Sequence, residues 1–207
     1  MKKAILLAPL MLLAGCAGKI SYTPPASTAS ANNTALIDAP IDTVWAAAVP
    51  KLSKQFFVIN NLDKASGLIN VSYTGDPEKY VDCGQISSYV NNLHGARTYV
   101  FPAASAFKAY EVLVNGQYAQ INRKMELEGR VNLIFEAVNK NQTRVSAHTK
   151  YVVTKTITSP NFAGTDKNSV DFNTGGSGMF AGPTPATVCR ATGALEQEIL
   201  KAVSSDQ

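Results

Sequence analysis

The chain has 207 residues, with 19 Lys and Arg against 15 Asp and Glu, so its formal net charge at pH 7 is only +4. This small excess, without a clustered basic stripe, argues against nucleic-acid binding. The length suits one ordinary domain and gives no indication of two cores.

The N-terminus has the three zones of an export signal. Lys2 and Lys3 are followed by an apolar run over residues 4–13 and then by small residues. The run has about ten residues, or roughly 15 Å as a helix, whereas a membrane span needs about 20 residues. It therefore cannot serve as an ordinary transmembrane anchor.

The motif Leu13-Ala14-Gly15-Cys16 resembles the lipobox of bacterial lipoproteins. The resemblance implies that the sulfur of Cys16 receives a diacylglycerol and that the signal peptide, residues 1–15, is cut off between Gly15 and Cys16. Acyl chains would then hold the mature protein in a membrane. Because Ala17 and not Asp follows the cysteine, the resemblance also implies outer-membrane sorting, with the domain facing the periplasm. The alternative is an ordinary thiol behind a soluble-type signal.

Residues 16–34 are expected to be the acylated cysteine and a flexible tether. The stretch is rich in Ser, Thr, Ala, Pro and Asn and shows no apolar period. Such a tether would hold one domain, residues 35–207, roughly 20–25 Å from the anchored cysteine.

The domain is expected to begin with a strand, a helix and a hairpin. Residues 35–37 form a short apolar run, and after Pro40 the apolar positions have the spacing of a buried helix face. Those positions are Ile41, Trp45, Ala48, Val49, Leu52 and Phe56. Pro50 should kink this helix or end it early. Apolar residues 56–59 and alternating residues 69–73 flank a polar turn and predict a hairpin.

A second, longer hairpin is expected in the middle of the domain. Apolar and polar side chains alternate over residues 125–137 and 145–157, on either side of a polar turn at 140–142. One face of this hairpin should be dry and the other wet. Residues 96–118 are also expected to be rich in strand.

The last part of the chain is expected to be a loop followed by a helix. Residues 159–185 are dense in Gly, Asn, Asp and Pro and predict a flexible Gly-rich loop. The helix has an apolar stripe formed by Val188, Thr192, Leu195, Ile199 and Val203. Glu196 and Glu198 are expected to lie away from this stripe.

The expected order of strand, helix, antiparallel strands and final helix is that of an α+β domain. With the segment APIDTVW at residues 39–45, it resembles helix-grip domains and is similar to domains of the C lipoprotein of the outer-membrane barrel-assembly machinery. The resemblance implies an antiparallel curved sheet packed against an N-terminal helix and a C-terminal helix. It implies no functional residue beyond the lipobox.

Two cysteines remain besides the lipobox cysteine, Cys83 and Cys189. In an oxidising periplasm two remaining thiols tend to pair. The disulfide would close a loop of about 107 residues, which the chain-entropy model values at roughly 4–5 kcal/mol. The alternative is two buried free thiols.

The sequence indicates no catalytic, metal or cofactor site. His94 lies in a turn-like segment and His148 on the polar face of an alternating strand, so a Cys-His nucleophile pair is not expected. Two distant histidines provide no zinc site, and the spacing of Asp166 and Asp171 does not match a calcium loop. The glycines at 175–178 are not followed by lysine, which argues against a phosphate loop. Carboxylates on the wet strand face are expected to be solvated; they are Glu126, Glu128 and Glu136.

The leading hypothesis is a membrane-anchored lipoprotein that acts as a non-enzymatic accessory or protein-binding module of the cell envelope. Its partners would be the membrane, through the acyl chains, and another envelope protein. The alternative is a periplasmic carrier of a hydrophobic ligand, because helix-grip sheets can leave a cavity beside the terminal helix. Side chains such as Leu133 and Ile199 packing there would remove that cavity. An enzyme with residues 159–185 as a lid is the third hypothesis.

Overall fold

The computed structural model of the protein describes residues 17–26, 32–55, 57–182 and 185–204. Of these residues, 63% lie in strands and 15% in helices. The predicted α+β helix-grip domain is therefore wrong. The protein is built mainly from several antiparallel sheets, with two short α-helices.

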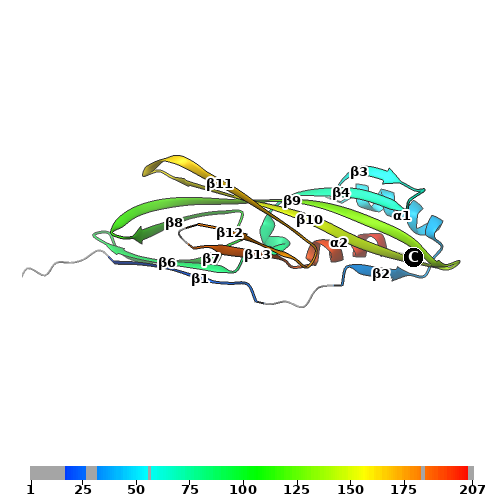
Figure 1. The fold of residues 1–207 in the computed structure, drawn as a ribbon, viewed down its shortest axis with the longest axis horizontal. Coiled ribbons are helices and arrows are strands. Elements are labelled where there is room, and N and C mark those ends of the chain that lie inside the picture. The colour runs from blue at the N-terminus through cyan, green and yellow to red at the C-terminus, as the bar shows by residue number, and fades with distance from the viewer. Residues whose placement is uncertain (1–16, 27–31, 56, 183–184, 205–207) are drawn as a thin grey trace, which may run out of the picture.

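A long hairpin of β9 (Gln117–Asn139) and β10 (Gln142–Ser159) runs through the whole molecule (Figure 1). At about 3.3 Å per residue, the 23 residues of β9 span roughly 75 Å. Every second residue is buried, over 123–135 in β9 and over 143–155 in β10. The predicted long hairpin, with its dry and wet faces, is confirmed.

Shorter strands extend this hairpin into a sheet of seven strands, all paired antiparallel. They are β2 (Thr34–Ile37), β3 (Val58–Asp63), β4 (Leu68–Gly75), β8 (Phe107–Val114) and β11 (Phe162–Asn173). The main order is β11-β10-β9-β4-β3. Because β2 and β11 pair with opposite ends of β10, and β4 and β8 with opposite ends of β9, the sheet has two differently flanked halves.

Two helices cover one half of the sheet, which we call the helical half. They are α1 (Ile41–Ser53) and α2 (Ala194–Ser204), and both pack on the dry face of the long hairpin (Figure 1). Trp45 of α1 meets the ring of Phe135 edge-on, with ring centroids 5.2 Å apart. A helix of 13 residues spans roughly 20 Å, so it cannot line a hairpin of this length. No helix in the described part of the chain is long and apolar enough to cross a membrane.

The other half, which we call the β half, contains a sheet with the order β1-β6-β7. Its strands are β1 (Ala17–Thr23), β6 (Gln85–Asn92) and β7 (Gly95–Pro102), and the sheet packs against β8. Residues 17–23 are therefore not part of a flexible tether, as predicted, but a strand paired with β6 over its whole length. The strand was missed because only Ile20 and Tyr22 give it an apolar period.

A small third sheet has the order β12-β13-β5. Its strands are β5 (Val81–Asp82), which follows a short 3-10 helix η1 (Pro77–Lys79), β12 (Ser177–Phe180) and β13 (Thr187–Ala191). The predicted flexible loop at 159–185 is thus wrong, since β11 and β12 occupy much of it. Most side chains of β11 are exposed, so the strand has no apolar period and is held by backbone pairing with β10. The start of the predicted final helix is wrong too, because β13 precedes it.

The predicted disulfide is confirmed. Cys83 and Cys189 are bonded, with their Cα atoms 3.9 Å apart, and both residues are fully buried. The bond ties the segment after β5 to the middle of β13.

Candidate functional site

The structure places the residues singled out by sequence in separate regions. Gly15 and Cys16, the predicted cleavage and lipidation residues, lie outside the described residues. His94 is exposed in the turn after β6, and His148 is exposed on the outer face of β10. No group of three or more metal-binding side chains occurs in the described part of the chain.

Three segments meet at the free end of the β half, and we call them the tip: residues 17–18, 91–96 and 113–118. Ala17 pairs with Asn91, and a side chain at Gly18 would collide with Leu113, so β1 lies tightly against both hairpins. Asn115 has a positive φ of 52°, as a two-residue hairpin turn requires. The tip is the end of the molecule at which β1 starts (Figure 1).

A hollow of about 590 Å³ lies between the two hairpin turns of the tip. It is lined by Asn92, Leu93, His94, Arg97, Glu111, Tyr118 and Gln120. None of these is a Ser, Thr or Cys, so the lining offers no hydroxyl or thiol nucleophile of the usual kind.

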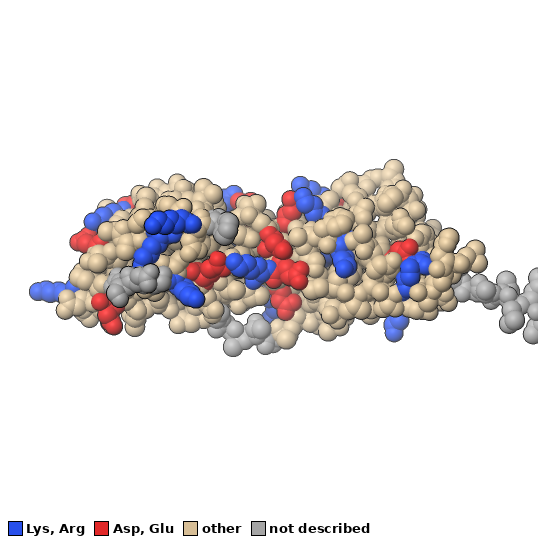
Figure 2. Space-filling model, turned by 180° about the vertical axis from the view of Figure 1, so that it is seen from behind, with Lys and Arg blue, Asp and Glu red and all other residues tan. Residues whose placement is uncertain are grey.

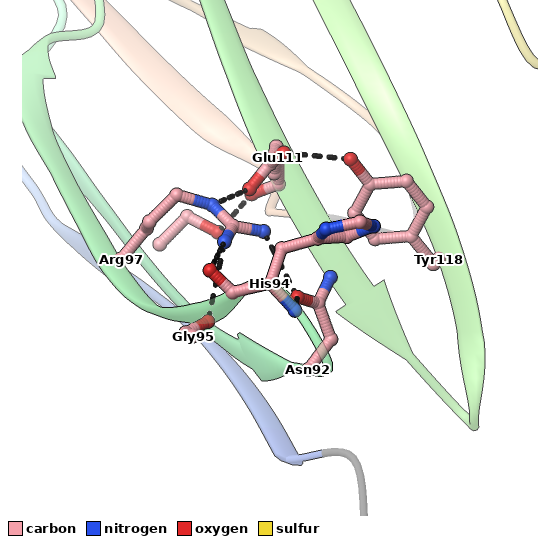
Figure 3. A network of polar contacts seen from close by, with 7 residues as sticks. Asn92, His94, Gly95, Arg97, Glu111 and Tyr118 are labelled. Carbon is pink, nitrogen blue, oxygen red and sulfur yellow. Dashed lines mark hydrogen bonds and ion pairs between the residues drawn. The ribbon is translucent and has the colours of Figure 1, made fainter.

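A carboxylate joins the strands around this hollow (Figure 3). Nε of Arg97 on β7 donates to Oε2 of Glu111 on β8 at 2.5 Å. The hydroxyl of Tyr118 on β9 donates to the other oxygen of Glu111 at 2.6 Å. The Glu111 side chain is only 14% exposed. One carboxylate therefore links β7, β8 and β9.

The two terminal nitrogens of the Arg97 guanidinium hold the turn between β6 and β7 (Figure 3). Nη1 donates to the carbonyl oxygens of His94 and Gly95, at 3.1 and 3.2 Å. Nη2 donates to Oδ1 of Asn92 at 3.2 Å. The turn is thus held in one shape by a side chain of the next strand.

The electrostatics of this network oppose proton transfer. Burial alone would raise the pKa of Glu111, but the hydrogen bonds from Arg97 and Tyr118 outweigh it and bring the pKa below the ordinary 4.5. The hydrogen bond to Glu111, helped by burial, raises the pKa of Tyr118. The carboxylate stays ionised and the phenol stays protonated near neutral pH, which suits a fixed binding surface better than acid–base catalysis.

The network predicts a pH effect on stability. Because the pKa of Glu111 is lowered by folding, its contribution is fully present above the ordinary 4.5 and is lost as the pH falls through the folded-state value. Thermal unfolding at pH 7 and pH 3 should therefore show a smaller acid-induced drop in melting temperature for Glu111→Gln than for the unaltered protein. Tyr118→Phe, which removes one of the two bonds, should lie between them. Equal drops in all three proteins would contradict the prediction.

Two further hollows lie on the surface of the described residues. One of about 240 Å³ adjoins the tip hollow and shares Glu111 and Gln120 with it. Another, of about 490 Å³, lies on the outer face of the large sheet beside His148. The cations on that face have partners, since Arg130 pairs with Glu128 at 2.7 Å and Lys150 with Asp171 at 3.1 Å.

Sequence reasoning missed several polar residues that the fold buries. Glu196 is fully buried, and Arg123 and Lys155 are 4% and 6% exposed. Arg123 donates through Nη2 to the carbonyl of Ala103 at 2.8 Å, and burial lowers the pKa of both cations. Glu196 was expected away from the apolar stripe of its helix, so that expectation is wrong.

The polar residues that line the hollow beside the tip were also missed, although one signal points to them. Asn115-Gly116 is the strongest short hairpin signal in the chain, and it predicts that Glu111 and Tyr118 lie on adjacent strands. Arg97 could not be placed beside them, because no local sequence pattern predicts that β7 packs on β8.

Comparison of the chain with protein-family models, with curated proteins and with solved structures gives no match. Function is therefore inferred from the chain's own motif and geometry. The motif is the one at residues 13–16 that resembles a lipobox, and the geometry is that of the tip, of its hollow and of the edge strand β3.

Proposed function

We propose that the chain is a lipid-anchored lipoprotein of the bacterial outer membrane that faces the periplasm and binds another envelope protein without catalysing a reaction. The lipobox at residues 13–16 supports the anchor. The described domain begins at Ala17, directly after the cysteine that would carry the acyl chains. The hollow beside the tip supports a binding role, since Arg97, Glu111 and Tyr118 in its lining are fixed by one another.

The exposed edge of β3 carries the proposal of a protein partner. β3 is the last strand of the large sheet and pairs with β4 on one side only. Val58 is 63% exposed and Leu62 is 46% exposed, and the strand has no charged side chain before Asp63. Asn60 and Asn61 lie between these two side chains, and the pairing with β4 shifts register between Ile59 and Asn61. An exposed edge without a charge before its last residue is a template on which a strand of a partner can pair.

The packing of the core does not support the alternative function, a carrier of a hydrophobic ligand. The dry face beneath the terminal helix is filled by side chains that are at most 3% exposed and belong to one core cluster. They are Met125, Leu127, Leu133, Phe135, Tyr151, Val153, Leu195 and Ile199. The position expected of a cavity is thus occupied by the protein itself.

Site-specific photo-crosslinking in envelopes of the producing organism tests the proposal. A photoreactive residue in place of Val58 should give one discrete adduct of higher mass. Adding Leu62→Lys should reduce its yield by about tenfold, because a charge on the edge disfavours strand pairing. The matched control replaces Lys167, which is exposed on the opposite edge strand β11, and should give no such adduct. No adduct at Val58, or the same adduct at both positions, would contradict the proposal.

A further inference from the structure

The start of β1 fixes where the membrane must lie if Cys16 carries the lipid. Ala17 is paired with Asn91, and the pairing continues without a break to Thr23. Consecutive Cα atoms are about 3.8 Å apart, so the acylated residue is one step from the tip and no flexible spacer separates them. The bilayer surface and the tip are therefore held together by the covalent chain.

The tip combines a lack of acidic, lysine and arginine side chains with one very exposed leucine. Its segments, residues 17–18, 91–96 and 113–118, contain no Asp, Glu, Lys or Arg. Leu93 projects from the turn between β6 and β7 and is 92% exposed. A large apolar side chain so exposed on an uncharged turn has no partner within the domain, and it would gain by entering the acyl boundary of a bilayer.

The next residues away from the tip suit the headgroup layer. Lys19 and Tyr89 are register partners on the outward face of the β1-β6-β7 sheet, and both are exposed. Tyrosine favours the membrane–water interface, and a lysine near the surface is attracted by anionic headgroups. Along the molecule, the tip without Asp, Glu, Lys or Arg comes first and the basic and aromatic side chains come next. This spatial order matches that of the bilayer, from the acyl chains to the headgroups.

The opposite end of the molecule has the reverse character. The turns there carry Asp63, Lys64 and Lys140, and α1 begins with Asp42 in its first turn. Figure 2 shows charged side chains near both ends of the face that it draws: they reach the outermost atoms of the helical half, whereas at the end at which β1 starts only the outermost part is uncharged. The contrast is thus confined to the outermost part of each end.

We propose that the tip is a membrane-contact surface, in which Leu93 enters the bilayer that holds the acyl chains of Cys16 and fixes the domain end-on. This inference rests on the lipid anchor in the proposed function. Strand β3 pairs with Val71 of β4, and Val71 in turn pairs with Val131 of β9. Because Val131 lies 14 residues along β9 from Gln117 at the tip, β3 would stand roughly 45 Å from the tip. The edge that is proposed to bind a partner would then lie well away from the membrane surface.

Depth-dependent quenching on vesicles tests the orientation with the full acylated chain. Cys83 and Cys189 are bonded, and the sulfur of Cys16 carries the lipid in the acylated chain, so Leu93→Cys introduces the one thiol free for labelling with an environment-sensitive fluorophore. Val138→Cys, at an exposed apolar position at the far end, is the matched control. On phosphatidylcholine–phosphatidylglycerol vesicles with a shallow spin-labelled lipid, the first label should lose about half of its emission or more, and the second almost none.

Flotation of the same vesicles distinguishes failure of the tip contact from failure of the lipid anchor. Protein that floats while the Leu93→Cys label stays unquenched would overturn the tip contact and leave the anchor intact. Protein that neither floats nor carries the mass of acyl chains would overturn the anchor and, with it, the tip contact. A label on His94→Cys, in the same turn, should repeat the quenching and excludes a disturbance by the first label.

Discussion

Replacement of Cys83 and Cys189 together by alanine is expected to lower the free energy of unfolding by about 4–5 kcal/mol. The two residues are 106 positions apart in sequence, so the bond closes a loop that contains all strands from β6 to β12. Without it, the unfolded chain gains the entropy of that long loop. Denaturant unfolding of the oxidised protein and of the double variant measures the difference.

Reduction of the unaltered protein supplies the control for this prediction. It should reproduce most of the loss without changing any side-chain volume, whereas the double variant also removes two buried sulfur atoms. A loss below about 2 kcal/mol in both samples would mean that the unfolded chain keeps structure that already limits the loop.

The long hairpin could be predicted because each of its strands has one dry face and one wet face. Alternation over residues 125–137 and 145–157 depends on burial of one side against the core, and it reports the strand directly. β1 and β11 lack this alternation for two different reasons. β1 has few apolar residues and β11 is exposed over residues 162–169, so each is stabilised mainly by backbone pairing, which leaves no pattern in the side chains.

The helix-grip prediction was wrong although its order of strand, helix, antiparallel strands and helix is present in the chain. The order does not reveal that β9 continues far beyond the helices and forms a second half. That half is closed by β1, which comes from the supposed tether, and by strands around residues 96–118, which were expected only in outline. Pairing between segments so distant in sequence is set by the whole core and not by local periodicity.

The disulfide could be predicted from the count of cysteines, but the polar network beside the tip could not be predicted from the residue types. Arg97, Glu111 and Tyr118 look like ordinary surface residues of three strands. They become a network only when β7 packs beside β8, and the resulting low exposure of Glu111 is what makes the bonds strong.

Tyr151→Phe is expected to lower the free energy of unfolding by about 2–3 kcal/mol, because a buried carboxylate loses a charge-assisted hydrogen bond. The hydroxyl of Tyr151 on β10 donates to Oε2 of Glu196 on α2 at 2.7 Å, and Thr174 donates to Oε1 at 2.8 Å. Burial and the neighbouring Glu196 raise the pKa of Tyr151, so the phenol remains a donor at neutral pH. Denaturant unfolding at pH 7 measures the loss.

The same helix offers a matched control that isolates the effect of burial. Tyr80 donates to Oε2 of Glu198 at 2.9 Å, but the Glu198 side chain is 32% exposed and also pairs with Lys79. Water and the lysine can replace the lost donor there, so Tyr80→Phe should cost clearly less than Tyr151→Phe. Equal losses in the two variants would contradict the prediction, because they would mean that burial of Glu196 adds nothing to the strength of its hydrogen bond.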